Sequence, residues 1–169
     1  MALSRTFAKT VVFTLLVPYT VAVAIPRALQ RWRTHPQLPV DSTLARAAGS
    51  VSVLIGSLLY AHTAWQFVIE GRGTPSSTDE PEELVTGGIY AHVRNPMYVG
   101  VLLVAIGQAL RYRSVSALWW AAGCWIGFHG RVLEYEEPHL VETYGEEYDR
   151  YCERVPRWFP RVRSKTRVR

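Results

Sequence analysis

The sequence predicts an all-α fold: an integral membrane helical bundle of about four transmembrane helices, followed by a C-terminal amphipathic helix. The hydrophobic residues, 49% of the 169 in the chain, form long runs, whereas the charged residues are concentrated in residues 70–94 and 131–169. Apolar runs separated by charged segments are typical of helical membrane proteins. The sequence also lacks strand and helix alternation with a G-x-G-x-x-G motif, which argues against a soluble dinucleotide-binding fold.

Four apolar segments are the predicted spans: residues 6–25, 47–69, 97–110 and 114–128. The first two have about the length that a bilayer core requires, roughly 20 residues. The first ends before Pro26 and Arg27, and its apolar run is longer than that of a signal peptide, so we interpret it as a retained span. The last two are short and are separated by Arg111, Tyr112 and Arg113. Because arginine can extend to a membrane surface, we expect a tight helical hairpin, lengthened by flanking residues.

The charge distribution predicts the orientation of the bundle. Lys or Arg occupies positions 154, 157, 161, 163, 165, 167 and 169, and such a basic tail is typical of the cytoplasmic side. Four spans then place the N-terminus and residues 70–95 on that side as well. The first external loop carries Arg27, Arg31, Arg33 and Arg46, which opposes this orientation.

Small and aromatic residues predict two further features. Gly123, Gly127 and Gly130 have a spacing that lets helix backbones approach closely, although a chance run of small residues explains them equally well. Residues 138–169 form the predicted C-terminal helix and basic tail of a single domain, residues 1–169. Pro138 opens this helix, and Leu140, Tyr144, Tyr148, Tyr151 and Val155 lie near one face of it. Trp158 and Phe159 suit an anchor at the membrane interface.

Neither a metal site nor a nucleic-acid partner is predicted. Cys124 and Cys152 are far apart in the sequence, and no histidine has a partner at a metal-ligand spacing. The loop of residues 71–75 lacks the lysine and hydroxyl residue of a phosphate-binding loop, so we interpret it as a turn.

Two polar stretches, residues 87–100 and 134–140, lie where predicted spans meet water, and the hairpin would make them neighbours. In the first, Asn95 suits a helix N-cap and Pro96 the first helical residue. The exposed amides of that helix start, with Arg94 beside them, would favour a carboxylate. Tyr90 and Tyr98 offer aromatic surfaces, and Gly100 leaves room for a flat group.

Glu136 and Glu137 are adjacent carboxylates where the last span ends. They could accept hydrogen bonds from a ribose diol or attract an amino group or a sulfonium. A solvated helix end, followed by the further acids Glu142, Glu146 and Glu147, is the competing interpretation.

The run Val93-Arg-Asn-Pro-Met-Tyr-Val-Gly100, preceded by Gly88-Ile-Tyr90 and followed by Glu136-Glu-Pro-His-Leu140 and Tyr144-Gly145, resembles the isoprenylcysteine carboxyl methyltransferase and phospholipid methyltransferase superfamily. The resemblance covers residues 65–160. It implies a helical membrane enzyme that binds S-adenosyl-L-methionine at the cytoplasmic face. The residues that it assigns to the cofactor are Tyr90, Val93, Arg94, Asn95, Pro96, Tyr98, Gly100, Glu136 and Glu137. Many carboxyl methyltransferase relatives have histidine between the arginine and the proline. This chain has Asn95 there, and asparagine is the variant also seen among phospholipid-type relatives.

The resemblance implies methyl transfer to a membrane-soluble acceptor, a lipid or a prenylated small molecule, that enters from the bilayer. In-line transfer at carbon requires mainly alignment and exclusion of water. A carboxylate acceptor, such as that of an isoprenylcysteine-like molecule, needs no general base, whereas a phospholipid amine does. His92 and Glu137 are the candidate bases, and Arg94 is the third candidate catalytic residue. A membrane scaffold of the same fold without catalysis is the alternative class.

Overall fold

The computed structural model describes residues 18–31, 36–69 and 84–160. These residues form helices and loops and contain no strand, which confirms the predicted all-α class. The elements in chain order are η1 (Thr20–Ala24), α2 (Ile25–Arg31), α3 (Ser42–Ile69), η2 (Gly88–Ala91), α4 (Pro96–Tyr112), α5 (Val115–Arg131), η3 (Val132–Glu136), α6 (Glu137–Tyr144) and α7 (Glu146–Arg154). The turn at 71–75, the basic positions from 161 onward and most of the first predicted span lie outside the described residues.

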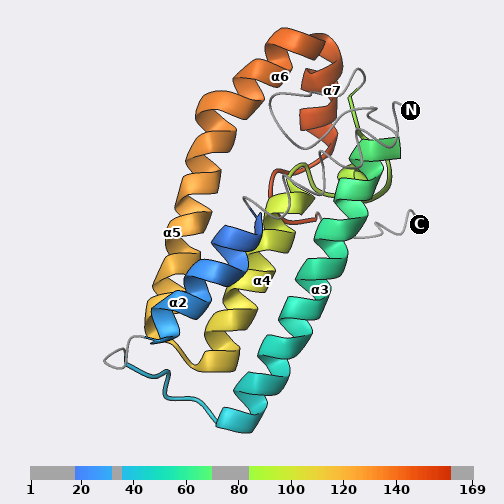
Figure 1. Cartoon of the computed structure of the whole chain (residues 1–169). Helices are drawn as coiled ribbons and strands as arrows, with labels where there is room; N and C mark the ends of the chain where they lie inside the picture. The colour runs from blue at the N-terminus through green and yellow to red at the C-terminus, as the bar shows by residue number, and fades with distance from the viewer. Residues whose placement is uncertain (1–17, 32–35, 70–83, 161–169) are drawn as a thin grey trace, which may run out of the picture.

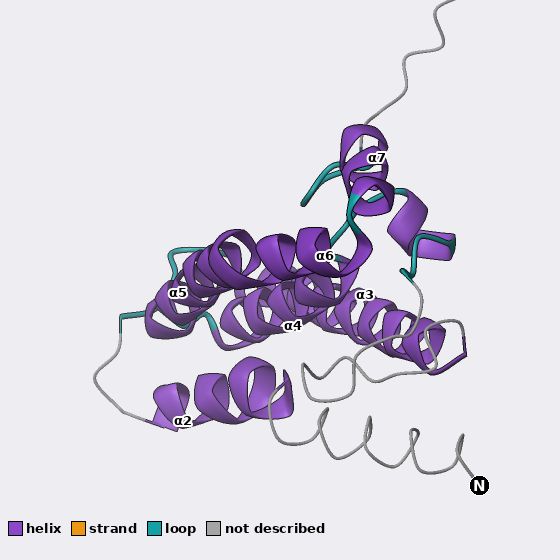
Figure 2. Cartoon of the chain, turned by 90° about the horizontal axis from the view of Figure 1, so that it is seen from above, coloured by secondary structure: helices purple, strands orange, loops and turns teal. Residues whose placement is uncertain are grey.

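Helices α2, α3, α4 and α5 run alternately in opposite directions, so their ends gather in two groups (Figure 1). Seen from above, α5, α4 and α3 form a row, and α2 packs against α4 and α5 on one side of it (Figure 2). At one end of the row, the loop after α2 meets the turn between α4 and α5. The other end carries η2, α6 and α7 (Figure 1).

Within the described residues, α3 is long and apolar enough to cross a membrane, by length and composition, and α4 is apolar but shorter. Helix α3 begins five residues before the predicted span. Asp41 explains this start, because its carboxylate accepts hydrogen bonds from the amides of Thr43 and Leu44 at 2.9 and 2.8 Å. This is the contact of a helix N-cap, and it holds the pKa of Asp41 below its ordinary value.

The closest helix contact joins α3 to α4 through four glycines. A Cβ on Gly49 would lie 2.6 Å from the carbonyl oxygen of Gly107, and a Cβ on Gly56 would lie 2.6 Å from that of Gly100. Between these two pairs, the Ser52 hydroxyl donates to the Leu103 carbonyl at 2.7 Å. The absence of side chains at the four positions therefore lets the two backbones touch.

The predicted hairpin of the last two apolar segments is confirmed by α4 and α5. Arg113 makes the turn in a left-handed conformation, with φ of 52°, and its guanidinium donates to the Leu38 carbonyl at 2.9 Å. Ser114 then caps α5 by accepting from the Ala117 amide at 3.2 Å. As expected, flanking residues lengthen both helices.

Two prolines lie inside continuous helix, where the sequence analysis expected a boundary. Pro26 does not end the first helical segment, which continues to Arg31. Pro138 lies in the first turn of α6, close to the predicted helix start, but the chain before it is already helical from α5 through η3. Each proline follows a π-helical stretch, η1 or η3. A wider π turn relieves the clash between a proline ring and the preceding turn, which a regular α-helix cannot do.

The predicted C-terminal helix is two helices, because Gly145 adopts φ of 53° between α6 and α7. Tyr148, Tyr151 and Val155 are buried together, and Leu140 and Tyr144 pack against them. These five residues therefore form one cluster across a break between two helices, and not one face of a single amphipathic helix.

The glycines of α5 do not make the predicted close helix approach within the described chain. A Cβ on Gly123, Gly127 or Gly130 would meet no atom within 4 Å. Among the described residues, the closely packed pair is instead α3 and α4, and no atom covers the three glycines of α5.

Candidate functional site

The start of α4 forms one side of the candidate site. Asn95 occupies the N-cap position and Pro96 the first helical position, as predicted. The Asn95 side chain does not cap the helix, however, and instead donates to the Arg157 carbonyl at 3.2 Å. Tyr90 and Val93 are buried just before the helix, and the Tyr90 carbonyl accepts from the Tyr151 hydroxyl at 2.7 Å. The start of α4 is thereby fixed to α7 and to the chain after it.

Glu137 lies between two guanidinium groups. Arg94 approaches its Oε1 at 3.0 Å. Arg157 donates from Nε to Oε1 at 2.6 Å and from Nη2 to Oε2 at 2.7 Å. The second pair is the bidentate geometry that gives the strongest guanidinium–carboxylate contacts. The hydrogen bond from Arg157 to Glu137 is also the main reason why the pKa of Arg157 is raised.

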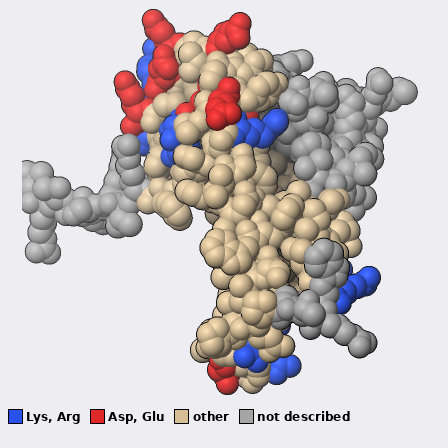
Figure 3. All heavy atoms as spheres, turned by 90° about the vertical axis from the view of Figure 1, so that its left-hand side faces the viewer, with Lys and Arg blue, Asp and Glu red and all other residues tan. Residues whose placement is uncertain are grey.

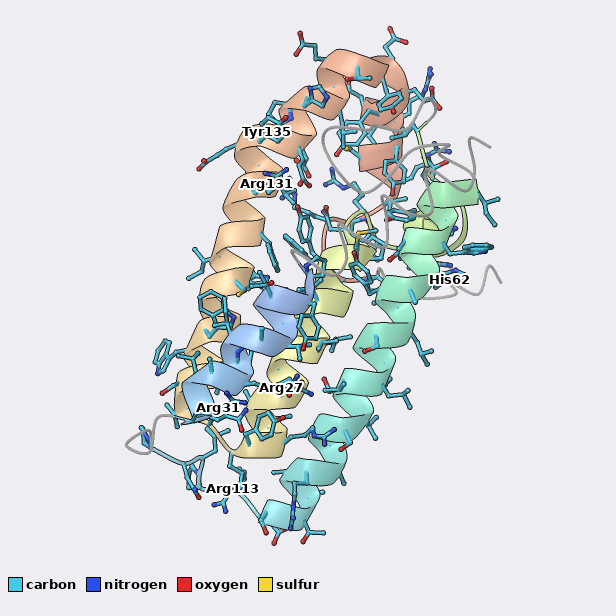
Figure 4. The ribbon with its side chains drawn as sticks, viewed as in Figure 1. Arg27, Arg31, His62, Arg113, Arg131 and Tyr135 are labelled. Carbon is cyan, nitrogen blue, oxygen red and sulfur yellow. The ribbon has the colours of Figure 1, made fainter. Side chains whose placement is uncertain are left out.

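Glu136 has a separate set of partners. Its Oε1 accepts hydrogen bonds from the Tyr98 hydroxyl and from Arg131 Nε, the latter at 2.8 Å. The Tyr98 ring stacks on Phe128, with centroids 4.6 Å apart. The adjacent carboxylates thus contact two different ends of the site. Figure 4 shows Arg131 at the end of α5 that continues toward Tyr135, and Arg113 at the opposite end of the bundle.

The segment of residues 155–158, here called the strap, crosses the start of α4. The Arg94 amide donates to the Pro156 carbonyl at 2.9 Å. The Trp158 indole donates to His129 Nδ1 at 3.1 Å, and its ring lies 6.5 Å from the ring of Tyr98. The strap therefore connects α4 and α5 and brings Arg157 to Glu137.

The structure separates two predicted site residues from this cluster. Gly100 lies in the α3 interface, where a Cβ would meet the Gly56 carbonyl at 2.9 Å, so it makes room for a helix and not for a flat ligand. His92 is exposed and lines a pocket of about 600 Å³ whose walls include Tyr151, Arg154 and Pro156. The other predicted site residues, from Tyr90 to Tyr98 and Glu136 with Glu137, gather at one end of the bundle.

Buried phenols surround the site as hydrogen-bond donors. Burial raises the pKa values of Tyr90, Tyr148 and Tyr151. These hydroxyls stay protonated at neutral pH, so they can donate hydrogen bonds but do not serve as bases. Among the described residues, no group of three or more metal-ligating side chains is present.

Sequence reasoning missed Arg131, Arg157 and the position of Trp158. Arg157 was counted with the basic tail, and Trp158 was interpreted together with Phe159 as a membrane anchor. Phe159 is 78% exposed, whereas Trp158 packs against the site. The local signal that separates Arg157 from the tail is its position directly after Pro156 and before two aromatic residues.

The sequence profile of the phospholipid methyltransferase family matches residues 44–147, so this chain belongs to that family. It is 39% identical to the protein-S-isoprenylcysteine O-methyltransferase of Schizosaccharomyces pombe over 88 aligned residues. The alignment covers 52% of this chain and 37% of the relative. It is 32% identical to the protein of the same name from Rattus norvegicus over 129 aligned residues, and this alignment covers 72% of this chain and 43% of the relative. The chain therefore spans less than half the length of these two relatives. The resemblance found in the sequence is confirmed.

Proposed function

We propose that this protein is a membrane-embedded methyltransferase that transfers a methyl group from S-adenosylmethionine to the carboxylate of a prenylated cysteine. Family membership and the names of its relatives support the reaction class. The observation that carries the proposal is the meeting of the start of α4 with the start of α6, where Arg94 contacts Glu137 at 3.0 Å. That contact joins the two sequence stretches on which the resemblance depends.

The donors at this end of the bundle fit the cofactor. S-adenosylmethionine carries a carboxylate, an amino group, a ribose diol, an adenine and a sulfonium, and when bound it supplies the methyl group. Arg94 offers a cationic donor for the carboxylate, and its Nε is buried without a hydrogen-bond partner among the described residues. Glu136 offers a carboxylate beside the stacked rings of Tyr98 and Phe128, which suit a cation or a flat ring.

A membrane location is supported by the apolar surface between the two ends of the bundle. Leu54 and Leu58 on α3 and Ile126 on α5 are each more than half exposed. Figure 3 shows a band without charged side chains on one face, with Lys, Arg, Asp and Glu gathered above and below it. We infer that the predicted first span, residues 6–25, and helices α3 to α5 cross the bilayer. The basic residues of the C-terminal tail favour the cytoplasmic face for the site. A lipid-soluble acceptor then reaches the site from the bilayer.

The contacts of Glu137 favour a carboxylate acceptor over an amine. Both Glu137 oxygens already accept hydrogen bonds from guanidinium groups, so taking a proton from an ammonium would require breaking them. His92 is exposed and lines a pocket to which neither Glu136 nor Glu137 contributes. A carboxylate is a nucleophile without losing a proton, and the site needs only to align it with the methyl group and keep water out.

The test is methyl transfer from methyl-tritiated S-adenosylmethionine by protein purified in detergent. With N-acetyl-S-farnesylcysteine as acceptor, we expect a product that releases volatile methanol in alkali, as methyl esters do. Phosphatidylethanolamine is the comparison acceptor, because an N-methyl product stays intact in alkali. Transfer to the phospholipid alone would contradict the carboxylate assignment, and transfer to neither acceptor by folded protein would contradict the enzyme assignment.

A further inference from the structure

The strap adds a positive charge to a site that already holds one. Arg94, Glu137 and Arg157 form a continuous cluster, and their side chains are only 11%, 17% and 30% exposed. The match to the family profile ends at residue 147, so Arg157 lies outside the region on which family membership depends.

The charges in this cluster do not balance. Two guanidinium groups share the single carboxylate of Glu137, and Glu136, the neighbouring acid, is held by Arg131 at 2.8 Å. Among the described residues the cluster therefore has an excess positive charge. A largely buried charge without a counterion is costly, so the cluster favours an anionic ligand.

The guanidinium groups also retain hydrogen-bonding capacity. Arg157 uses Nε and Nη2 on Glu137, which leaves Nη1. Arg94 uses Nη1 on Glu137 and on the Cys152 sulfur, and its buried Nε has no partner among the described residues. Each guanidinium has five N–H donors in a planar fork that matches a carboxylate.

We infer that Arg157 is a cofactor-binding residue, which together with Arg94 receives the carboxylate of the methionine part of the cofactor, and that Glu137 is a positioning residue that holds the two guanidinium groups in place. This inference rests on the proposed function and adds a residue from the strap to the site. The reaction has a second anion, the carboxylate of the methyl acceptor, which the same two arginines could also bind. Measuring cofactor binding without acceptor therefore shows whether Arg157 binds the cofactor carboxylate.

The experiment compares two ligands that differ at the amino-acid end. S-adenosylhomocysteine carries the carboxylate, and 5′-deoxy-5′-methylthioadenosine lacks the whole amino-acid end. Calorimetry on the full chain in detergent would measure both affinities for the wild type, Arg157→Gln, Arg157→Lys and Arg154→Gln. Arg154 is the matched control, because it is exposed and its guanidinium donates only to the Arg150 carbonyl among the described residues.

We expect Arg157→Gln to weaken S-adenosylhomocysteine binding by about tenfold or more and to change methylthioadenosine binding by less than about twofold. Arg157→Lys keeps the charge but loses the fork, so it should show a smaller loss for the same ligand alone, and it carries the test if Arg157→Gln does not fold. Arg154→Gln should change neither affinity. Equal weakening of both ligands, or of neither, would overturn the inference while leaving the proposed function intact. Failure of the folded wild type to bind S-adenosylhomocysteine would overturn both.

Discussion

The interface between α3 and α4 and the cluster around Glu137 join distant parts of the chain by different means. In the interface, glycine backbones touch, and a Cβ would lie 2.6 Å from a facing carbonyl at Gly49 and again at Gly56. In the cluster, Arg94 from the segment before α4 and Arg157 from the strap meet Glu137 of α6, with N to O distances of 2.6 to 3.0 Å. The first kind of contact leaves no room for added side-chain volume, and the second depends on the Glu137 carboxylate between two guanidinium groups.

The two contacts therefore have different roles in the molecule. The glycine contact fixes how close α3 comes to α4 and so positions the start of α4. The charge cluster then fixes what that start of α4 presents to a ligand. Substitutions in the two regions should therefore separate loss of fold from loss of binding.

The largest expected effect comes from Gly107→Leu. A side chain there would meet the Gly49 carbonyl at 2.7 Å, so α3 and α4 would have to separate. We expect a loss of about 3 kcal/mol or more in the free energy of unfolding, or no folded protein, from this overpacking. Thermal unfolding in detergent checks it. Gly127→Leu is the matched control, because nothing lies within 4 Å of a Cβ there. An equal loss of stability in both variants would contradict the claim that the close approach of α3 to α4 is what requires glycine at position 107.

A smaller effect on stability, with a specific loss of binding, is expected for Glu137→Ala. This change leaves Arg94 and Arg157 facing each other without their carboxylate. We expect about 2 kcal/mol of lost stability, less than for a fully buried pair because the side chains are partly exposed, and cofactor binding weaker by about tenfold or more. Glu146→Ala is the control, since that carboxylate is 91% exposed and pairs with Arg150 at 3.8 Å. Calorimetric titration with S-adenosylhomocysteine that gave the same affinity for both variants would contradict the assigned site.

Tyr98→Phe should have the smallest effect of the three. It removes the hydroxyl that donates to Glu136 but keeps the ring that stacks on Phe128. Because Arg131 still holds Glu136, we expect the free energy of cofactor binding to weaken by only about 1 kcal/mol, which corresponds to about fivefold lower cofactor affinity. Tyr135→Phe serves as control, since Tyr135 is 47% exposed. Unchanged affinity in Tyr98→Phe would remove Glu136 and its partners from the binding site.

The sequence predicted those parts of the fold that depend on local rules. The start of α4 at Asn95 and Pro96 and the hairpin of α4 and α5 follow from residue preferences and segment lengths. The hairpin in turn predicted that residues 87–100 and 134–140 would meet, and the contacts Arg94 to Glu137 and Tyr98 to Glu136 confirm this. The catalytic and binding roles of these residues stay predictions.

What the sequence did not predict depends on longer-range contacts. The predicted first span ends before Pro26, and the predicted C-terminal helix begins at Pro138. In the structure the chain is helical on both sides of each proline, and a π turn precedes each one. Gly100 was assigned to a ligand because it lacks side-chain bulk and belongs to the motif that carries the resemblance. Its contact with Gly56, 44 residues away, has no local signal in the sequence. Arg157 was assigned to the basic tail because composition alone does not reveal its pairing with Glu137, 20 residues earlier.

The most direct test of the central claim is S-adenosylmethionine binding by the purified, folded protein. Isothermal titration in detergent should give saturable binding at one site per chain, and Arg94→Ala should weaken that binding by about tenfold or more while Glu146→Ala leaves it unchanged. Absence of saturable binding, under conditions where thermal unfolding shows that the protein is folded, would contradict the account.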